Sequence, residues 1–157
     1  MILHQNIPEE MYLSILERMP ICCVDVVVTH LSRILLVLRK ECGRWWLPGG
    51  RVCKNETLYE AAYRKVLEEV GIKTRIVKQF GVYEWVPAVN GKLQGKLYSN
   101  IDSGLHVITT GFLVTPVEDI DVQLDETSMD YKWVDAIESS WHPMLVDIIS
   151  DSGAINA

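Results

Sequence analysis

The charged residues between Gly50 and Gly71 have the types and spacing that could bind a metal ion and a phosphate group. Apolar residues recur every four positions from Thr57 to Val70, which predicts a helix that ends at Gly71. The charged residues near the end of this helix are Arg64, Glu68 and Glu69. Adjacent carboxylates beside a glycine turn, with its free carbonyls, can supply the hard oxygen ligands that Mg²⁺ or Mn²⁺ prefers. A diphosphate and water molecules can complete the coordination.

The same helix also has an ordinary interpretation. Arg64 with Glu68, and Lys65 with Glu69, are four residues apart, a spacing that is common for salt bridges on solvated helices. At this spacing Arg64 can also orient the Glu68 carboxylate through a charge-assisted hydrogen bond. Because the spacing alone fits both interpretations, the wider pattern has to decide between them.

The wider pattern resembles the Nudix box, G-x5-E-x7-R-E-U-x-E-E-x-G-U, in which U is aliphatic. The matching positions are Gly50, Glu56, Arg64, Val66, Glu68, Glu69, Gly71 and Ile72. The resemblance implies an α/β (α+β) fold, the Nudix α/β/α sandwich with a mixed central sheet. Residues 1–157 would form a single domain, with the box as a loop–helix–loop at the rim of the sheet.

One defined position of the box departs from the family. Lys65 stands where the family has the first glutamate of its R-E pair. In ordinary Nudix pyrophosphatases that glutamate binds metal or takes part in the acid–base chemistry. Lysine removes an oxygen ligand and changes the local charge by about +2. One metal ion held by Glu69, with or without Glu68, is therefore more plausible than a cluster, and either altered chemistry or lost activity would follow.

A further resemblance, to the GDP-mannose mannosyl hydrolases, extends over most of the chain. These Nudix relatives also lack that glutamate, and they cleave the C1–O bond of the sugar. In and near the box the shared residues are Gly49 to Val52, Lys54 and Glu56 to Leu58. Elsewhere they include Pro20, Asp25, Arg39, His106, Asp130, Tyr131 and Trp133. The resemblance implies that the Gly49 carbonyl and Glu69 bind Mg²⁺ or Mn²⁺. Glu68, the adjacent carboxylate on the helix, is a further candidate ligand. The residues that the resemblance implies for binding the nucleotide sugar are Asp25, Arg39 and Arg51.

Arginine suits this role because its guanidinium can bind phosphate oxygens in pairs. Arg39 and Arg51 each retain the alternative of being ordinary surface charges.

The general base is the second departure from the mannosyl hydrolases. They use a histidine on the loop before their D-Y-x-W segment, and Ser128 occupies the matching position. Serine without a partner is a poor base near neutral pH, so Glu126 on the same loop is predicted to serve. Glu84 and His106 are weaker candidates, and His106 is more typical of a structural histidine. The predicted catalytic residues are Arg64, Glu68 and Glu126.

Three functions remain open at this point. The leading hypothesis is a divalent-metal-dependent hydrolase of nucleoside diphosphate-linked compounds, with a nucleotide sugar such as GDP-mannose attacked at C1. The products would be a free sugar and a nucleoside diphosphate. The second is a conventional Nudix pyrophosphatase that attacks phosphorus, with Glu126 or Glu68 as base. The third is a non-catalytic Nudix module that binds a nucleotide, which Lys65 and Ser128 favour.

Periodicity predicts the remaining elements. Helices are expected over Pro8–Met19 and Trp141–Ile149. Strands are expected over Ile21–Thr29, Arg33–Leu38, Thr74–Trp85, Leu105–Thr115 and Tyr131–Val134, with a loop over 89–104. The segment Trp45–Gly50 breaks the pattern, because Pro48 cannot donate to a ladder. The tryptophans could stack on a base, although most tryptophans lie in cores or interfaces.

Composition limits the location and the partners. The net charge of −6 argues against nucleic-acid binding, and no apolar run reaches the length of a membrane span. The chain start lacks the pattern of a signal peptide. The spacing of Cys22, Cys23, Cys42 and Cys53 favours free thiols over zinc or disulfides, which fits a cytoplasmic protein. The first predicted helix and the strand after it could form a homodimer interface, as dimeric Nudix families suggest.

Overall fold

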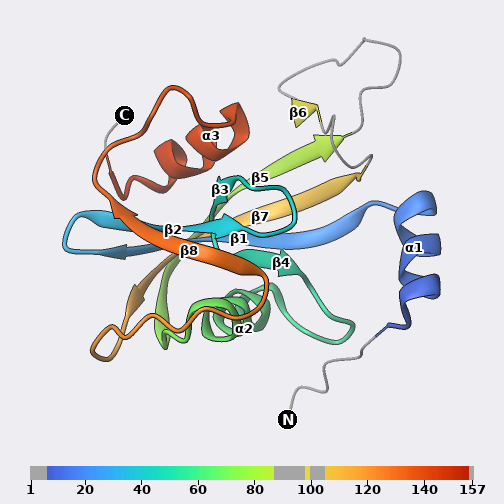
Figure 1. Cartoon of the computed structure of the whole chain (residues 1–157), viewed down its shortest axis with the longest axis horizontal. Helices are drawn as coiled ribbons and strands as arrows, with labels where there is room; N and C mark the ends of the chain where they lie inside the picture. The colour runs from blue at the N-terminus through green and yellow to red at the C-terminus, as the bar shows by residue number, and fades with distance from the viewer. Residues whose placement is uncertain (1–6, 87–97, 100–104, 156–157) are drawn as a thin grey trace.

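The computed structural model describes residues 7–86, 98–99 and 105–155. The helices are α1 (Glu9–Arg18), α2 (Leu58–Val70) and α3 (Pro143–Ser152). The strands are β1 (Ile21–His30), β2 (Arg33–Arg39), β3 (Trp45–Trp46), β4 (Gly49–Arg51), β5 (Thr74–Val86), β6 (Tyr98–Ser99), β7 (Val107–Pro116) and β8 (Ser128–Val134). Helices α2 and α3 lie on opposite sides of the strands (Figure 1). This is the α/β/α sandwich with a mixed sheet that the sequence predicts.

Strand β1 is the centre of the sheet. It pairs in parallel with β7 and antiparallel with β4 and β2. The main strand order is β3-β2-β1-β7-β5-β6, with β4 on β1 and β8 on β2. Because β1 is covered on both faces, it reads as a nearly continuous apolar run, and Val24 and residues 26–28 are fully buried. Strand β1 therefore fixes the positions of the elements packed on both faces of the sheet.

The two faces of the sheet have separate cores. On one face Val24, Val26 and Val28 pack with Ala62 and Val66 of α2. On the other face Val27 packs with residues of α3, and Asp25 shares this side because strand residues alternate between faces. The site residues carried by β1 and by α2 consequently lie on different sides of the sheet.

Helix α2 is fixed by signals at both of its ends. The Thr57 hydroxyl accepts a hydrogen bond from the Glu60 backbone N–H (3.2 Å), and the Glu60 carboxylate accepts one from the Thr57 N–H (2.7 Å). This is a capping box. Gly71 ends the helix in the left-handed conformation, with φ of 71°. The predicted bounds of the helix are confirmed to within one residue.

The structure corrects three of the predicted elements. Trp45–Gly50 contains β3 and the start of β4, which are too short to give a periodic signal, and the Pro48 carbonyl accepts a hydrogen bond from the Val26 N–H. Strand β8 begins at Ser128, and α3 begins at Pro143 after the His142 cap. The loop predicted over 89–104 lies outside the described residues, apart from Tyr98–Ser99, which form β6.

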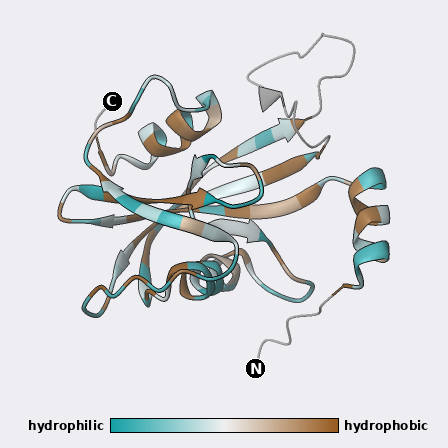
Figure 2. Ribbon diagram, viewed as in Figure 1, coloured by the Kyte–Doolittle hydropathy of each residue, from teal (hydrophilic) through white to brown (hydrophobic). Residues whose placement is uncertain are grey.

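Helix α1 extends from one end of the sheet (Figure 1). None of its residues is buried, and hydrophobic and hydrophilic residues alternate along it (Figure 2). Since β1 is interior, α1 is the part of the predicted dimer interface that a second copy could reach. Among the described residues, no helix is long and apolar enough to cross a membrane.

Candidate active site

The carboxylate of Glu69 is the centre of the site. Its side chain is 1% exposed, and residues of two strands and of its own helix contact it. Oxygen Oε1 accepts a hydrogen bond from Arg39 Nη1 (3.1 Å) and lies 2.9 Å from Lys65 Nζ. Oxygen Oε2 accepts a hydrogen bond from the Gly49 backbone N–H (3.2 Å). The structure thus brings together the predicted residues Arg39, Gly49 and Glu69.

Arg64 of α2 holds the loop at the start of the Nudix-like box against the helix. Its guanidinium donates to both oxygens of Glu56 (2.5 and 2.9 Å), to Glu68 (3.1 Å) and to the Arg51 carbonyl (2.9 Å). The hydrogen bonds and the charge of Glu56 raise the pKa of Arg64. The Glu56 side chain is fully buried. The sequence predicts the pair with Glu68, but it does not reveal that Glu56 is the principal partner of Arg64.

Lys65 lies across the glycine turn. A side chain on Gly50 would come within 2.8 Å of Lys65 Cε, and the φ of 151° at Gly50 disfavours any side chain there. This gap lets the Lys65 ammonium reach Glu69, with Glu68 Oε2 at 3.8 Å. The predicted i,i+4 pair of Lys65 with Glu69 is therefore present, but its carboxylate is buried and its lysine is only 16% exposed.

The oxygen atoms present fit one divalent cation. The Gly49 carbonyl and the carboxylates of Glu68 and Glu69 are the hard donors that Mg²⁺ or Mn²⁺ takes. Glu68 is 39% exposed, so its carboxylate is accessible from solvent. No group of three or more His, Cys, Asp or Glu side chains suited to a metal occurs in the described part of the chain. Arg39 also donates to the Gly49 carbonyl (3.4 Å) and to Glu69, so a single ion bound here would share these oxygens with the arginine, and Lys65 stands where the box has the carboxylate that a cluster would use.

Asp25 lies on the α3 side of the sheet, opposite Gly49 in the pairing of β1 with β4, and the charges of Arg39 and Glu69 still act on it. Its buried carboxylate accepts hydrogen bonds from Trp46 Nε1 (2.9 Å) and from the Thr109 hydroxyl (2.7 Å). Burial raises the pKa of Asp25, against the lowering effect of these two bonds. Asp25 therefore holds Trp46 and Thr109 in place, and the substrate contact implied by the resemblance stays a prediction.

Replacement of Asp25 with asparagine is expected to increase stability at high pH. The raised pKa means that folding favours the protonated carboxyl, so its contribution to stability is lost as pH rises through the folded pKa. Asparagine does not titrate, and its amide oxygen can still accept from Trp46 while its amide N–H donates to the Thr109 hydroxyl. In thermal melts from about pH 4 to about pH 8, the advantage of the variant should grow with pH. An advantage that stays constant across the series would contradict this.

Arg51 contacts α1. Its guanidinium lies 5.7 Å from the centre of the Tyr12 ring, a cation–π arrangement. Its backbone carbonyl receives Arg64, so the residue supports the box through its main chain. Arg39 is therefore the predicted substrate-binding arginine that the structure places at Glu69.

The predicted general base lies on a loop that is fixed beside the site. The Asp125 N–H donates to the Glu69 carbonyl (3.2 Å), and the Lys40 N–H donates to the Thr127 carbonyl (2.9 Å). Glu126, between these two attachments, is exposed. Ser128 is buried, and its hydroxyl has no hydrogen-bond partner among the described residues. Glu126 therefore remains the candidate base.

Comparison with known proteins agrees with this geometry. The model of the NUDIX domain matches residues 19–147. The chain belongs to the Nudix family. A Haloferax volcanii relative, the low-salt glycan biosynthesis protein Agl8, is 31% identical over 141 residues, which are 88% of this chain and 85% of the relative.

Solved Nudix structures have the same fold. A NUDIX hydrolase from Nitrosomonas europaea is 24% identical with a TM-score of 0.64, and the match covers 86% of this chain and 89% of that one. A MutT NUDIX hydrolase from Burkholderia pseudomallei is 22% identical with a TM-score of 0.66, covering 85% and 98% of the two chains. Nudix hydrolases generally use divalent metal ions, which agrees with the single-ion donor set described above.

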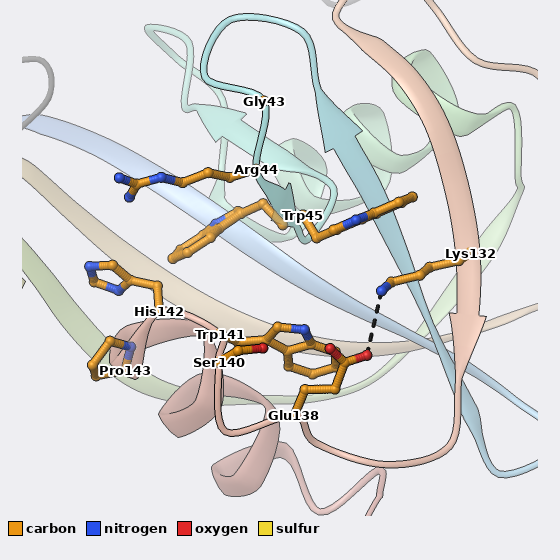
Figure 3. A pocket seen from close by; sticks show the side chains of 10 residues that line it. Gly43, Arg44, Trp45, Lys132, Glu138, Ser140, Trp141, His142 and Pro143 are labelled. Atoms are coloured by element: carbon orange, nitrogen blue, oxygen red, sulfur yellow. Dashed lines mark ion pairs between the residues drawn. The ribbon is translucent and has the colours of Figure 1, made fainter.

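This Nudix chain also has a cavity of about 540 Å³ between β3, β8 and the turn before α3 (Figure 3). The Lys132 ammonium lies between two indole rings, 4.6 Å from the centre of Trp45 and 5.8 Å from that of Trp141. Glu138 pairs with Lys132 at 3.6 Å. Trp46 lines the cavity and also donates to Asp25, so it links the cavity to β1, where Asp25 is the pairing partner of Gly49.

The sequence suggests that Trp45 and Trp46 could stack on a nucleotide base. It does not predict that Trp141 and Lys132 line the same cavity. These residues are far apart in the chain, and no local pattern joins them.

Proposed function

We propose that the protein hydrolyses nucleotide sugars, with GDP-mannose as the first substrate to test, by attack of water at C1 of the sugar. The products are the free sugar and a nucleoside diphosphate. The observation that carries this proposal is the group around Glu69, in which Lys65 stands in place of a carboxylate and points its ammonium at the centre of the site.

The charge of the site favours cleavage at carbon. Attack on phosphorus in this family is expected to use a cluster of carboxylates and metal ions, and Lys65 stands in place of one of those carboxylates. Two cations, Arg39 and Lys65, meet at Glu69. Such a site suits a reaction in which a diphosphate leaves with its full negative charge.

Each step has a candidate group. Water forms a bond to C1, the bond from C1 to the diphosphate oxygen breaks, and the electron pair leaves with the diphosphate. Glu126 accepts the proton of the attacking water. Arg39 binds the oxygens of the departing diphosphate. Gly49, Glu68 and Glu69 are the residues that would hold a divalent cation, which would supply further positive charge against the leaving group.

The similarity to Agl8 supports a substrate from glycan metabolism. The name of that relative places it in glycan biosynthesis, where activated sugars are the usual reactants. Its match covers most of both chains, so it extends beyond the box to the strands that form the rest of the site.

The cavity beside β3 suits the part of the substrate beyond the diphosphate. Two indole rings and a lysine can hold a planar base or a sugar face. Replacement of Trp141 with alanine is expected to raise KM for GDP-mannose about tenfold, because stacking contributes roughly 1–3 kcal/mol per base. The turnover number should change little. Initial-rate kinetics measure both constants, and an unchanged KM would place the substrate elsewhere.

The proposed reaction is tested with GDP-mannose, Mg²⁺ and ¹⁸O-labelled water, followed by mass spectrometry of the products. Label in mannose supports attack at C1. Label in a phosphate product would replace this proposal with a pyrophosphatase, which attacks phosphorus. If GDP-mannose and a panel of other nucleoside diphosphate derivatives bind but are not turned over, the protein is a non-catalytic nucleotide-binding module.

We also infer that α1 is the contact between two copies in a homodimer. Met11, Leu13 and Met19 are exposed on or beside a helix with no buried residue. Sedimentation equilibrium of the full chain, compared with a Met11→Lys variant, measures this. A wild-type protein that sediments as a monomer would contradict the inferred homodimer.

A further inference from the structure

We propose that the Lys65 ammonium is a built-in cation that binds the substrate diphosphate directly, in place of a second metal ion. The inference rests on the proposed function, because its ligand is the nucleoside diphosphate part of that substrate. It assigns a binding task to the residue at which the box departs from the family pattern.

The charges around Glu69 balance without any added ion. Three cations face three carboxylates in the connected network, which consists of Arg39, Arg64, Lys65, Glu56, Glu68 and Glu69. With glutamate at position 65 the same network would carry a charge of about −2, which one divalent cation neutralises. Lysine at this position therefore does electrostatically what an additional divalent cation would do in the usual box.

The position of Lys65 Nζ supports the replacement of a metal ion by the lysine. The ammonium is 2.9 Å from Oε1 of the buried Glu69 and 3.8 Å from Oε2 of Glu68, so it lies within reach of both candidate metal ligands. Its side chain occupies the space that Gly50 leaves open. A surface salt bridge needs neither a buried partner nor a glycine beneath it, so the arrangement is specific to this site.

The ammonium can bind an anion while it keeps its contact with Glu69. An ammonium has three N–H donors, and the contact with Glu69 uses one of them. Arg39 approaches the same oxygen of Glu69 from β2. The side chains of Lys65 and Arg39 are 16% and 20% exposed, so part of each is accessible to solvent. Two partly exposed cations that converge on one carboxylate oxygen can bind a diphosphate.

The direct test is binding of GDP in the presence of EDTA, measured by isothermal titration calorimetry. The wild-type chain is expected to bind GDP without metal. Lys65→Met should weaken this binding about 10- to 100-fold, the usual effect of losing a charge-assisted hydrogen bond. Lys65→Arg should restore binding to within about threefold of wild type, since it keeps the charge and the donors.

Lys73→Met is the matched control. Lys73 follows the same helix, and its exposed pair with Glu118 (3.1 Å) lies outside the site. This variant should bind GDP as the wild type does. Lack of GDP binding by the wild type in EDTA, or equal binding by the Lys65→Met and Lys73→Met variants, would overturn the proposal.

Metal binding provides a readout that does not depend on the substrate. Titration with Mn²⁺, followed by electron paramagnetic resonance, should show one site in the wild type and at least one more in Lys65→Glu. This Mn²⁺ titration also tests the role of Lys65 if the Lys65→Met variant fails to fold. An unchanged number of Mn²⁺ sites in Lys65→Glu would show that the lysine does not replace a cation.

The two proposals fail in different ways. Labelling of a phosphate product from GDP-mannose would end the C1 mechanism, but it would leave the metal-independent binding of GDP unaffected. Equal GDP affinities of the Lys65→Met variant and the wild type would contradict the proposed role of Lys65, even if mannose acquired the label.

Discussion

Replacement of Glu69 with glutamine is expected to lower kcat/KM for GDP-mannose by about a hundredfold or more. The carboxylate is the only group in the described site that contacts Arg39, Lys65 and the Gly49 N–H together. Glutamine has nearly the same size, but its uncharged amide binds a divalent cation weakly and faces two cations with an N–H group that repels them. Steady-state kinetics over a range of Mg²⁺ concentrations measure the effect.

Glu118→Gln is the control for this substitution, since Glu118 is an exposed carboxylate paired with Lys73 away from the site. The Glu69→Gln variant should also lose its Mn²⁺ signal in electron paramagnetic resonance. Full turnover at ordinary Mg²⁺ would show that Glu69 is not the metal ligand.

Replacement of Arg64 with methionine is expected to lower the free energy of unfolding by about 3–5 kcal/mol, as for other broken buried ion pairs. The reason is the fully buried Glu56, both of whose carboxylate oxygens accept hydrogen bonds from Arg64. Methionine preserves much of the packing but leaves that carboxylate without its counter-charge. Urea denaturation measures the change, and the melting temperature should fall by roughly 6–20 °C for a domain of this size.

A second substitution separates the charge effect from lost packing. Adding Glu56→Gln to Arg64→Met removes the buried charge, so the double variant should recover part of the lost stability. Additive losses from the two changes would mean that the pair is not coupled, contrary to the structure. Arg64→Lys should recover little, because a single ammonium cannot bind both oxygens of Glu56 in the plane of the guanidinium.

The box could be predicted because its determinants are local. Thr57 and Gly71 specify the two ends of α2 through contacts within four residues, and the contact of Arg64 with Glu68 spans one helical turn. The paired strands followed from runs of β-branched residues. The resemblance to the Nudix box rests on local signals of this kind, so the amino-acid sequence alone was enough to reveal it.

Other parts of the site depend on register and on distant segments. The side of the sheet on which Asp25 lies is set by the pairing of β1 with β4, and a shift of one residue would reverse it. Lys132 and Trp141 meet Trp45 only because β8 and the turn before α3 close over β3. The burial of the Lys65–Glu69 pair depends on Gly50, which the helical spacing of the pair does not include.

The parallel pairing of β1 with β7 also affects the order in which the protein can assemble during synthesis. Ile21 and Val107 are partners, so β1 leaves the ribosome long before its main partner exists. Helix α2 is complete by then, but Gly49 and Glu69 have no rigid sheet to hold them together. We expect the nascent chain to remain without a functional site until β7 emerges, with the apolar residues of β1 exposed to chaperones in the interval.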